Sequence, residues 1–366
     1  MGMKNKISTS APGRICLFGE HQDNLKLPVI PVAISKRVNI QAEIINNSNI
    51  KIHLQNTNSS EEFNITDNIT YDKDKDYFKS SINVLKRLNY EFTKGLDVNV
   101  SGYIPIHSKL SSSASLVVAW IKLLTKLNGI DLSPNEIAKL AYRAEMLEFN
   151  EPGGKMAHYT TALGGVMFLD FEPQVKIERL STNLGTFVIG NSGQPKDTKA
   201  ILANVKIHAE YIANKIKFID SNFSFRNTAL EEFNKYRKYF PRNDFNLLLA
   251  AKRNYNITMQ AKELFTDEKF YSQKEIGKLL NKEQQILREE LNVSTNKINR
   301  MIDASLNAGA YGAKINDSSS GCMFAYAPEN PEEVAESLRK MGCKAFIVKP
   351  DEGVMIHDDS YSLIAS

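Results

Sequence analysis

The stretch that decides the fold is a serine run followed by an apolar segment, Pro105-Ile106-His107-Ser108-Lys109-Leu110-Ser111-Ser112-Ser113-Ala114-Ser115-Leu116-Val117-Val118-Ala119-Trp120-Ile121. Serine is a preferred residue at a helix start, and the segment 116–124 is apolar on nearly all sides, which predicts a buried helix. The first N–H groups of a helix have no partner within it and lie at the positive end of its dipole. The serines are therefore either a helix cap or, together with those N–H groups, a binding site for an anion such as phosphate. Three consecutive serines are more than a cap requires.

The composition is that of a soluble globular protein. The chain has 366 residues, enough for two domains, with 42% hydrophobic and 24% charged residues. The net charge is +4, without a basic block interleaved with aromatic residues, so we expect no nucleic-acid partner. No apolar run is long enough to span a membrane and the N-terminus is polar, so we expect neither a membrane partner nor a signal peptide. Three cysteines without metal or disulfide spacing favour a cytoplasmic protein.

The periodicity of apolar residues predicts strands first and helices later. Alternating patterns predict mainly strands over the first hundred residues, interrupted by a helix at 77–88. A capping box at 133–136 predicts the start of another helix. Residues 198–306 have helical patterning, and 322–348 read as strand, helix and strand. The second half is therefore expected to be of the α+β class.

Polar residues gather in two further places besides the serine run. The first, in the loop after an N-terminal strand, carries Glu20 and Asp23, and the second is the turn-rich passage 145–159. Taken alone, acidic residues in a loop are also typical of a solvated turn, and Glu145 of an exposed helix face. A lone histidine such as His158 is more often structural than catalytic.

These motifs, with Gly312-Ala313-Lys314-Ile315 and the small-residue loop after it, resemble the GHMP kinases in their order along nearly the whole chain. That family includes galactokinase, homoserine kinase, mevalonate kinase and phosphomevalonate kinase. The resemblance implies an α+β fold of two domains, 1–195 and 196–366, the first ribosomal-S5-like and the second ferredoxin-like. It also implies transfer of the γ-phosphoryl group of ATP to a small alcohol, with Mg²⁺ as the metal ion.

The resemblance assigns roles to residues as well. The catalytic positions are Arg14, which would stabilise charge near the transferred phosphoryl group, and Ala157. The expected acceptor-binding residues are Glu20, His21, Asp23, Gly154 and Tyr159. Those expected at the nucleotide phosphates are Lys109, Ser111, Ser112, Ser113 and Ala114. The expected Mg²⁺ ligands are Ser113 and Glu145.

The acceptor is less clearly indicated than the family. The opening from Arg14 to Asp23 resembles galactokinases, and paired carboxylates suit the several hydroxyl groups of a sugar. The segment 192–199 is more similar to mevalonate kinases. We expect a sugar kinase acting at the anomeric hydroxyl, with mevalonate kinase as the alternative; the sequence predicts no oligomeric state.

The chain departs from the family pattern at three places. Galactokinase-like sequences have the expected base, an aspartate, where this chain has Ala157, and alanine cannot accept a proton. Three explanations remain open: an engineered inactivation, a natural pseudokinase, or a different base such as His158. Residues 107–109 replace usual glycines before the serine run, and 316–320 contain no glycine. Because glycine lets the backbone approach a phosphate, a silent protein that binds sugar or nucleotide is the rival from another class.

Overall fold

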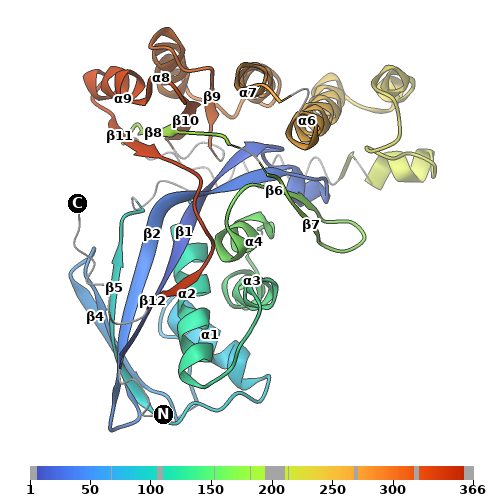
Figure 1. The fold of residues 1–366 in the computed structure, drawn as a ribbon. Coiled ribbons are helices and arrows are strands. Elements are labelled where there is room, and N and C mark those ends of the chain that lie inside the picture. Colours follow the sequence, from blue (N-terminus) through green and yellow to red (C-terminus); the bar gives the residue numbers. More distant parts are fainter. Residues whose placement is uncertain are drawn as a thin grey trace.

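The computed structural model shows two halves, each built on its own antiparallel or mixed sheet (Figure 1). The residues that it describes are 6–66, 68–104, 110–151, 153–181, 183–193, 211–212, 214–267, 271–316 and 321–357. The first sheet has six strands in the order β12-β1-β2-β5-β3-β4, and the second has four in the order β11-β8-β10-β9. The chain is thus an α+β protein, as expected from its sequence.

Four helices cover one face of the first sheet (Figure 1). Its strands are β1 (Lys6–Phe18), β2 (Ile30–Ile45), β3 (Asn49–Leu54), β4 (Ser59–Asn64), β5 (Gly95–Gly102) and β12 (Met355–His357). The helices are α1 (Tyr77–Lys86), α2 (Ser112–Leu127), α3 (Pro134–Tyr142) and α4 (Met156–Leu163), and a π-helical turn, η2 (Arg143–Leu147), follows α3. Helices α2 and α4 pack directly on β1 and β2, and α1 and α3 pack on α2. The serine run therefore opens a buried helix that lies against the first strand.

The second sheet contains a split strand–helix–strand unit. Its strands are β8 (Phe187–Asn191), β9 (Gly312–Ile315), β10 (Cys322–Tyr326) and β11 (Lys344–Val348). Helix α9 (Pro331–Lys340) joins β10 to β11, which both pair antiparallel with β8 and so run parallel to each other. Helices α8 (Asn296–Asn307) and α9 lie over this sheet, as in a ferredoxin-like half (Figure 1).

Further elements extend from these two sheets. Strands β6 (Met167–Asp170) and β7 (Lys176–Arg179) form a hairpin beside the start of β2. The helical part between β8 and β9 comprises η3 (Leu230–Tyr239), α6 (Arg242–Thr266), α7 (Gln273–Gln285) and η4 (Ile286–Glu290), and η1 (Gln22–Leu25) follows β1. Helices α6 and α7 both contact β1.

Two strands pair with the sheet of the opposite half. Strand β8, which precedes residue 195, lies in the second sheet, and β12, near the C-terminal end of the described chain, pairs with β1. In Figure 1 the red C-terminal strand runs beside the blue first strand. We keep the division into domains 1–195 and 196–366 as a proposal. In the structure, the sheet of each half includes a strand from the other side of residue 195.

Several local expectations match the structure. The predicted helix at 77–88 is α1, and Ser133 and Glu136 exchange the hydrogen bonds of a capping box, at 2.8 and 3.3 Å. No helix among the described residues is both long and apolar enough to cross a membrane.

Candidate active site

Strand β1 ends in a left-handed turn that places two polar residues inside the protein. Gly19 and His21 have φ angles of 84° and 67°, and a Cβ on Gly19 would lie 2.8 Å from the carbonyl oxygen of Pro28. Only glycine fits at that position. Glu20 and Gln22 are both 2% exposed. The alternative of a solvated turn therefore fails for Glu20.

Lys314 of β9 is fully buried and lies between two carboxylates. Its Nζ is 3.1 Å from Oε2 of Glu20 and 3.6 Å from Oε1 of Glu283, on α7. The same Nζ donates a hydrogen bond of 3.0 Å to the carbonyl oxygen of Cys16, and the Glu20 N–H donates to Oε1 of Glu283 at 3.0 Å. This group of four residues joins β1 and its turn to α7 and β9 of the other half.

The buried charges change one another's proton affinity. Burial alone would raise the pKa of Glu20, but the positive charges of Lys314, His21 and Arg14 outweigh it and hold this pKa below its ordinary value. Burial raises the pKa of Glu283 to about 7, against the opposing effect of Lys314. Burial would lower the pKa of Lys314, yet Glu20 and Glu283 raise it above its ordinary range. Lys314 and Glu20 thus form the ionised pair, while Glu283 is partly protonated near neutral pH.

Besides Oε2 of Glu283, four further side chains near this pair have buried polar atoms without a partner in the described part of the chain. They are Nε and Nη1 of Arg14, Nε2 of His21, Nε2 and Oε1 of Gln22, and Oδ1 of Asn254. Asn254 of α6 is connected to the turn, since its Nδ2 donates to the carbonyl oxygen of Glu20 at 3.3 Å. Buried polar groups in native proteins are normally hydrogen-bonded, so unmatched donors and acceptors gathered in one place indicate a site for a polar ligand.

The serine run forms the N-terminus of α2 without acting as an ordinary cap. Ser111 occupies the cap position in the left-handed conformation, at φ 66°, and its side chain accepts no capping hydrogen bond. Ser111, Ser112 and Ser113 are half-buried, and Ala114 is 2% exposed. The N–H groups of the first helical turn have no intrahelical acceptor, so they can bind an anion as we expected. Lys109 lies outside the described residues.

The N-terminus of α2 is held directly against the strand that carries Arg14. The N–H of Arg14 donates to the carbonyl oxygen of Leu110 at 3.0 Å. The hydroxyl of Ser115 donates to the carbonyl oxygen of Pro12 at 2.7 Å. These contacts bring the serine run and Arg14 into one site, although 97 residues of sequence separate Arg14 from Ser111.

Glu145 is 2% exposed in the π-helical turn η2, which packs against α2, so the alternative of an exposed helix residue fails. Its Oε2 is 2.8 Å from Nε2 of the fully buried His158. One carboxylate oxygen, Oε1, therefore remains for a metal ion, and Ser113 supplies a hydroxyl in the first turn of α2. No cluster of three His, Cys, Asp or Glu side chains suited to a metal occurs among the described residues. Glu145 and Ser113 fit Mg²⁺, which binds few protein oxygens and takes the rest from water and phosphate.

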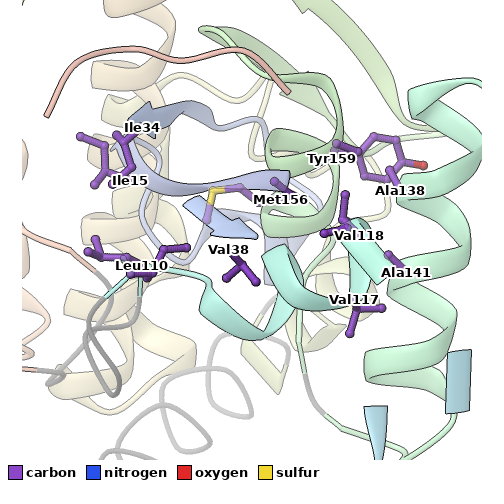
Figure 2. Packing of buried hydrophobic residues seen from close by; sticks show 14 of the residues in the cluster. Ile15, Ile34, Val38, Leu110, Val117, Val118, Ala138, Ala141, Met156 and Tyr159 are labelled. Atoms are coloured by element: carbon purple, nitrogen blue, oxygen red, sulfur yellow. The ribbon is translucent and has the colours of Figure 1, made fainter. Parts of the chain in front are cut away.

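The remaining predicted residues lie in helix α4 and in the turn before it. A Cβ on Gly154 would lie 1.6 Å from Oδ2 of Asp23, so these two residues are in contact and a side chain at position 154 would displace the Asp23 carboxylate. Ala157 is half-buried in the first turn of α4, which packs on β1. Tyr159 is 2% exposed and lies beside Ala138 of α3 in the hydrophobic core (Figure 2). The structure thus brings Gly154 to the acceptor side but does not bring Tyr159 there.

The sequence interpretation missed four residues of this site: Lys314, Glu283, Gln22 and Asn254. The sequence pattern does indicate Lys314, because a lysine between Ala313 and Ile315 in an apolar strand must have a buried partner. It does not indicate Glu283 and Asn254, since they lie on long helices rich in charged and polar residues.

Comparison with known proteins agrees with this geometry. The family model of the GHMP kinases N terminal domain matches residues 76–165, and the galactokinase galactose-binding signature matches residues 2–43. A mevalonate kinase of Thermococcus sibiricus is 30% identical over 364 residues, covering 96% of this chain and 99% of the relative. A galactokinase of Pyrococcus furiosus is 27% identical, covering 96% and 99%.

The fold has similar solved counterparts. The structure of Lactococcus lactis galactokinase complexed with galactose superposes with a TM-score of 0.83 at 21% identity, covering 96% of this chain and 95% of the other. Together with the full-length relative at 30% identity, the likeness extends over both halves and not only over the matched motifs. The chain belongs to the GHMP kinase family.

Proposed function

We propose that this chain transfers the γ-phosphoryl group of ATP to a hydroxyl group of a small sugar, the anomeric one. The observation that carries this proposal is the set of unmatched buried polar atoms on His21, Gln22 and Asn254. They include both donors and acceptors, and each sugar hydroxyl can donate and accept. The match of the galactose-binding signature to residues 2–43, which contain two of these side chains, supports the same acceptor.

Phosphoryl transfer depends on positioning and on charge neutralisation more than on covalent chemistry. In the proposed site, the first turn of α2 with Ser111, Ser112 and Ser113 holds the nucleotide phosphates. Ser113 and Oε1 of Glu145 would hold Mg²⁺, which would neutralise negative charge on the phosphates. On the acceptor side, Glu20 is held in place by Lys314, and Asp23 lies against Gly154.

Mevalonate is the second candidate acceptor, because the 30% identical relative is a mevalonate kinase. Ala157 favours a third candidate, a binding protein without kinase activity, because alanine cannot take a proton from the attacking hydroxyl. A protein that keeps the binding site without the base would bind sugar or nucleotide and release no ADP.

A coupled assay of ADP release discriminates among these three functions. The original chain and an Ala157→Asp variant are compared on a panel of hexoses and on mevalonate, each with ATP and Mg²⁺. We expect Ala157→Asp to raise turnover of a hexose by about 10²- to 10⁴-fold, the usual contribution of a positioned base. If only mevalonate is turned over, mevalonate and not a sugar is the acceptor. If a sugar binds but neither chain releases ADP, the kinase function is rejected and the protein is a silent binding protein.

A further inference from the structure

The turn after β1 is bound by three residues from the half of the chain that follows residue 195. The N–H of Glu20 donates to Oε1 of Glu283 on α7 at 3.0 Å, and its carbonyl oxygen accepts from Nδ2 of Asn254 on α6 at 3.3 Å. Its Oε2 is 3.1 Å from Nζ of Lys314 on β9. The backbone and the side chain of Glu20 are thus both held by residues at least 234 positions away in the sequence.

Two of these bonds fix the backbone on either side of Glu20. Peptide groups are planar, so a bond to the N–H of Glu20 orients the peptide plane before this residue, and a bond to its carbonyl oxygen orients the plane after it. The preceding Gly19 has a φ angle of 84°, and glycine has more conformational freedom than any other residue. The turn therefore depends on bonds from outside to keep one conformation.

Glu283 reaches the turn from a helix that is bound to the edge of the second sheet. Strand β9 is the last strand of this sheet in the described chain, so one row of its N–H groups has no neighbouring strand. The N–H of Ala313 donates to Oδ1 of Asn281 at 3.0 Å, and that of Ile315 donates to Oε1 of Gln284 at 2.9 Å. Helix α7 and β9 thus form one unit, which places Glu283 against the turn.

An alternative role for Glu283 is that of a counter-charge for Lys314. The distances favour the bond to the turn, because Oε1 of Glu283 is 3.0 Å from the nitrogen of Glu20 but 3.6 Å from Nζ of Lys314. Lys314 already has the Glu20 carboxylate at 3.1 Å and the carbonyl oxygen of Cys16 at 3.0 Å. Burial also raises the pKa of Glu283 to about 7, and a neutral carboxyl group still accepts a hydrogen bond.

We propose that Glu283 is a positioning residue for the acceptor, because its Oε1 fixes the turn that presents His21 and Gln22 to the sugar. Both side chains have buried polar atoms without a partner among the described residues. This inference rests on the proposed sugar kinase function and deepens it. Glu283 lies outside the segment 2–43 that matches the galactose-binding signature, so acceptor affinity depends on a contact between the two halves.

Isothermal titration of the full chain with galactose, without ATP, measures this contribution. Glu283→Leu removes the acceptor of the Glu20 N–H and should weaken galactose binding about tenfold, as expected for one hydrogen bond. Glu283→Gln keeps an amide oxygen at the same place and should stay within about twofold of the original chain. Glu275→Leu, which removes an exposed carboxylate of the same helix, is the matched control and should leave the affinity unchanged.

Binding of ADP to the same proteins separates positioning from a general loss of structure. The proposed phosphate site, at the N-terminus of α2, belongs to the first half, so the affinity for ADP should be equal in all of them. Glu283→Asp keeps a carboxyl group but is one CH₂ group too short to reach the Glu20 N–H. It should also weaken galactose binding, and it replaces Glu283→Leu if that variant does not fold.

Three results would overturn the proposal: unchanged galactose affinity in Glu283→Leu or Glu283→Asp, a loss in Glu283→Gln as large as theirs, or equal losses for galactose and ADP. If the original chain binds mevalonate and not galactose, the sugar kinase function fails, and the same variants titrated with mevalonate test Glu283 by the same criteria. Binding of neither acceptor rejects both proposals. ADP release is measured separately: its absence beside the expected galactose affinities rejects the kinase function and leaves the role of Glu283 standing.

Discussion

Two arginines on neighbouring strands, Arg14 of β1 and Arg37 of β2, are treated differently by the protein around them. Arg37 donates to Ser10, Asp351, Glu352 and Gly353 with all three of its nitrogen atoms, at 2.6 to 3.1 Å. The more deeply buried Arg14 has two nitrogen atoms without any partner in the described chain.

This difference in hydrogen bonding indicates that Arg37 has a structural role, whereas Arg14 is available to bind a ligand. Arg37 links the segment 351–353 to β1. It thereby fixes the segment that leads into β12, the C-terminal strand of the first sheet. No described residue accepts a hydrogen bond from Nε or Nη1 of Arg14, although an unpaired charge costs more at this more deeply buried position. Changes at these positions, and in the Lys314 group between the halves, should therefore have effects of very different size.

The largest loss of stability is expected from Lys314→Met, because Lys314 is a buried cation that does have its partners. The change leaves Glu20 and Glu283 buried without a counter-charge and should lower the free energy of unfolding by about 3–5 kcal/mol. Urea denaturation measures this. Lys278→Met removes a lysine whose side chain is 66% exposed and should cost at most about 0.5 kcal/mol. Equal losses in the two variants would refute the role of the buried group.

Arg37→Gln should have the second largest effect. It removes charge-assisted hydrogen bonds to Asp351 and leaves backbone carbonyl groups of the return segment unmatched, so we expect a loss of about 2–3 kcal/mol in the free energy of unfolding. Hydrogen exchange of the amide groups of β12 should become faster at the same time. Unchanged exchange in β12 would mean that Arg37 does not hold this strand.

Arg14→Gln should cost almost nothing in the absence of ligand. Since Nε and Nη1 of Arg14 have no partner among the described residues and a buried charge is removed, we expect the free energy of unfolding to stay within about 1 kcal/mol of the original or to rise. A loss as large as that of Arg37→Gln would show that Arg14 has a structural partner within the chain, and the contrast between the two arginines would disappear.

A separate prediction concerns the pH dependence of stability, which comes from Glu283. Burial raises its pKa from an ordinary value of 4.5 to about 7, so between these pH values the folded chain holds a proton that the unfolded chain has lost. Its contribution to stability is complete below about pH 4.5 and is lost as the pH rises toward 7. Compared with Glu283→Gln, the original chain should therefore lose stability between pH 5 and pH 8. A difference that is constant over this range would contradict the raised pKa.

Local parts of the fold could be predicted because their causes are local. Strand β10 spans the predicted residues Cys322 to Tyr326, and Gly342 follows α9 with φ 73°, as a helix-ending glycine requires. The capping box at Ser133 likewise depends on residues three positions apart. In each of these elements, the residues that determine the structure are neighbours in the sequence.

The rest of the site could not be predicted because it depends on pairs of residues far apart in the chain. Glu20 meets Glu283 across 263 positions and Lys314 across 294. Neither the periodicity of α7 nor that of β9 indicates which side chain it faces. The pairing of β12 with β1 has the same origin, since three residues are too few to give a strand signal.

Thermal denaturation of the original chain, Arg14→Gln and Arg37→Gln, each with and without ATP and Mg²⁺, tests the central claim most directly. If Arg14 is kept for the transferred phosphoryl group, ATP with Mg²⁺ will raise the melting temperature of the original chain and of Arg37→Gln more than that of Arg14→Gln. An equal rise in all three proteins would contradict the account, because the ligand would then bind without Arg14.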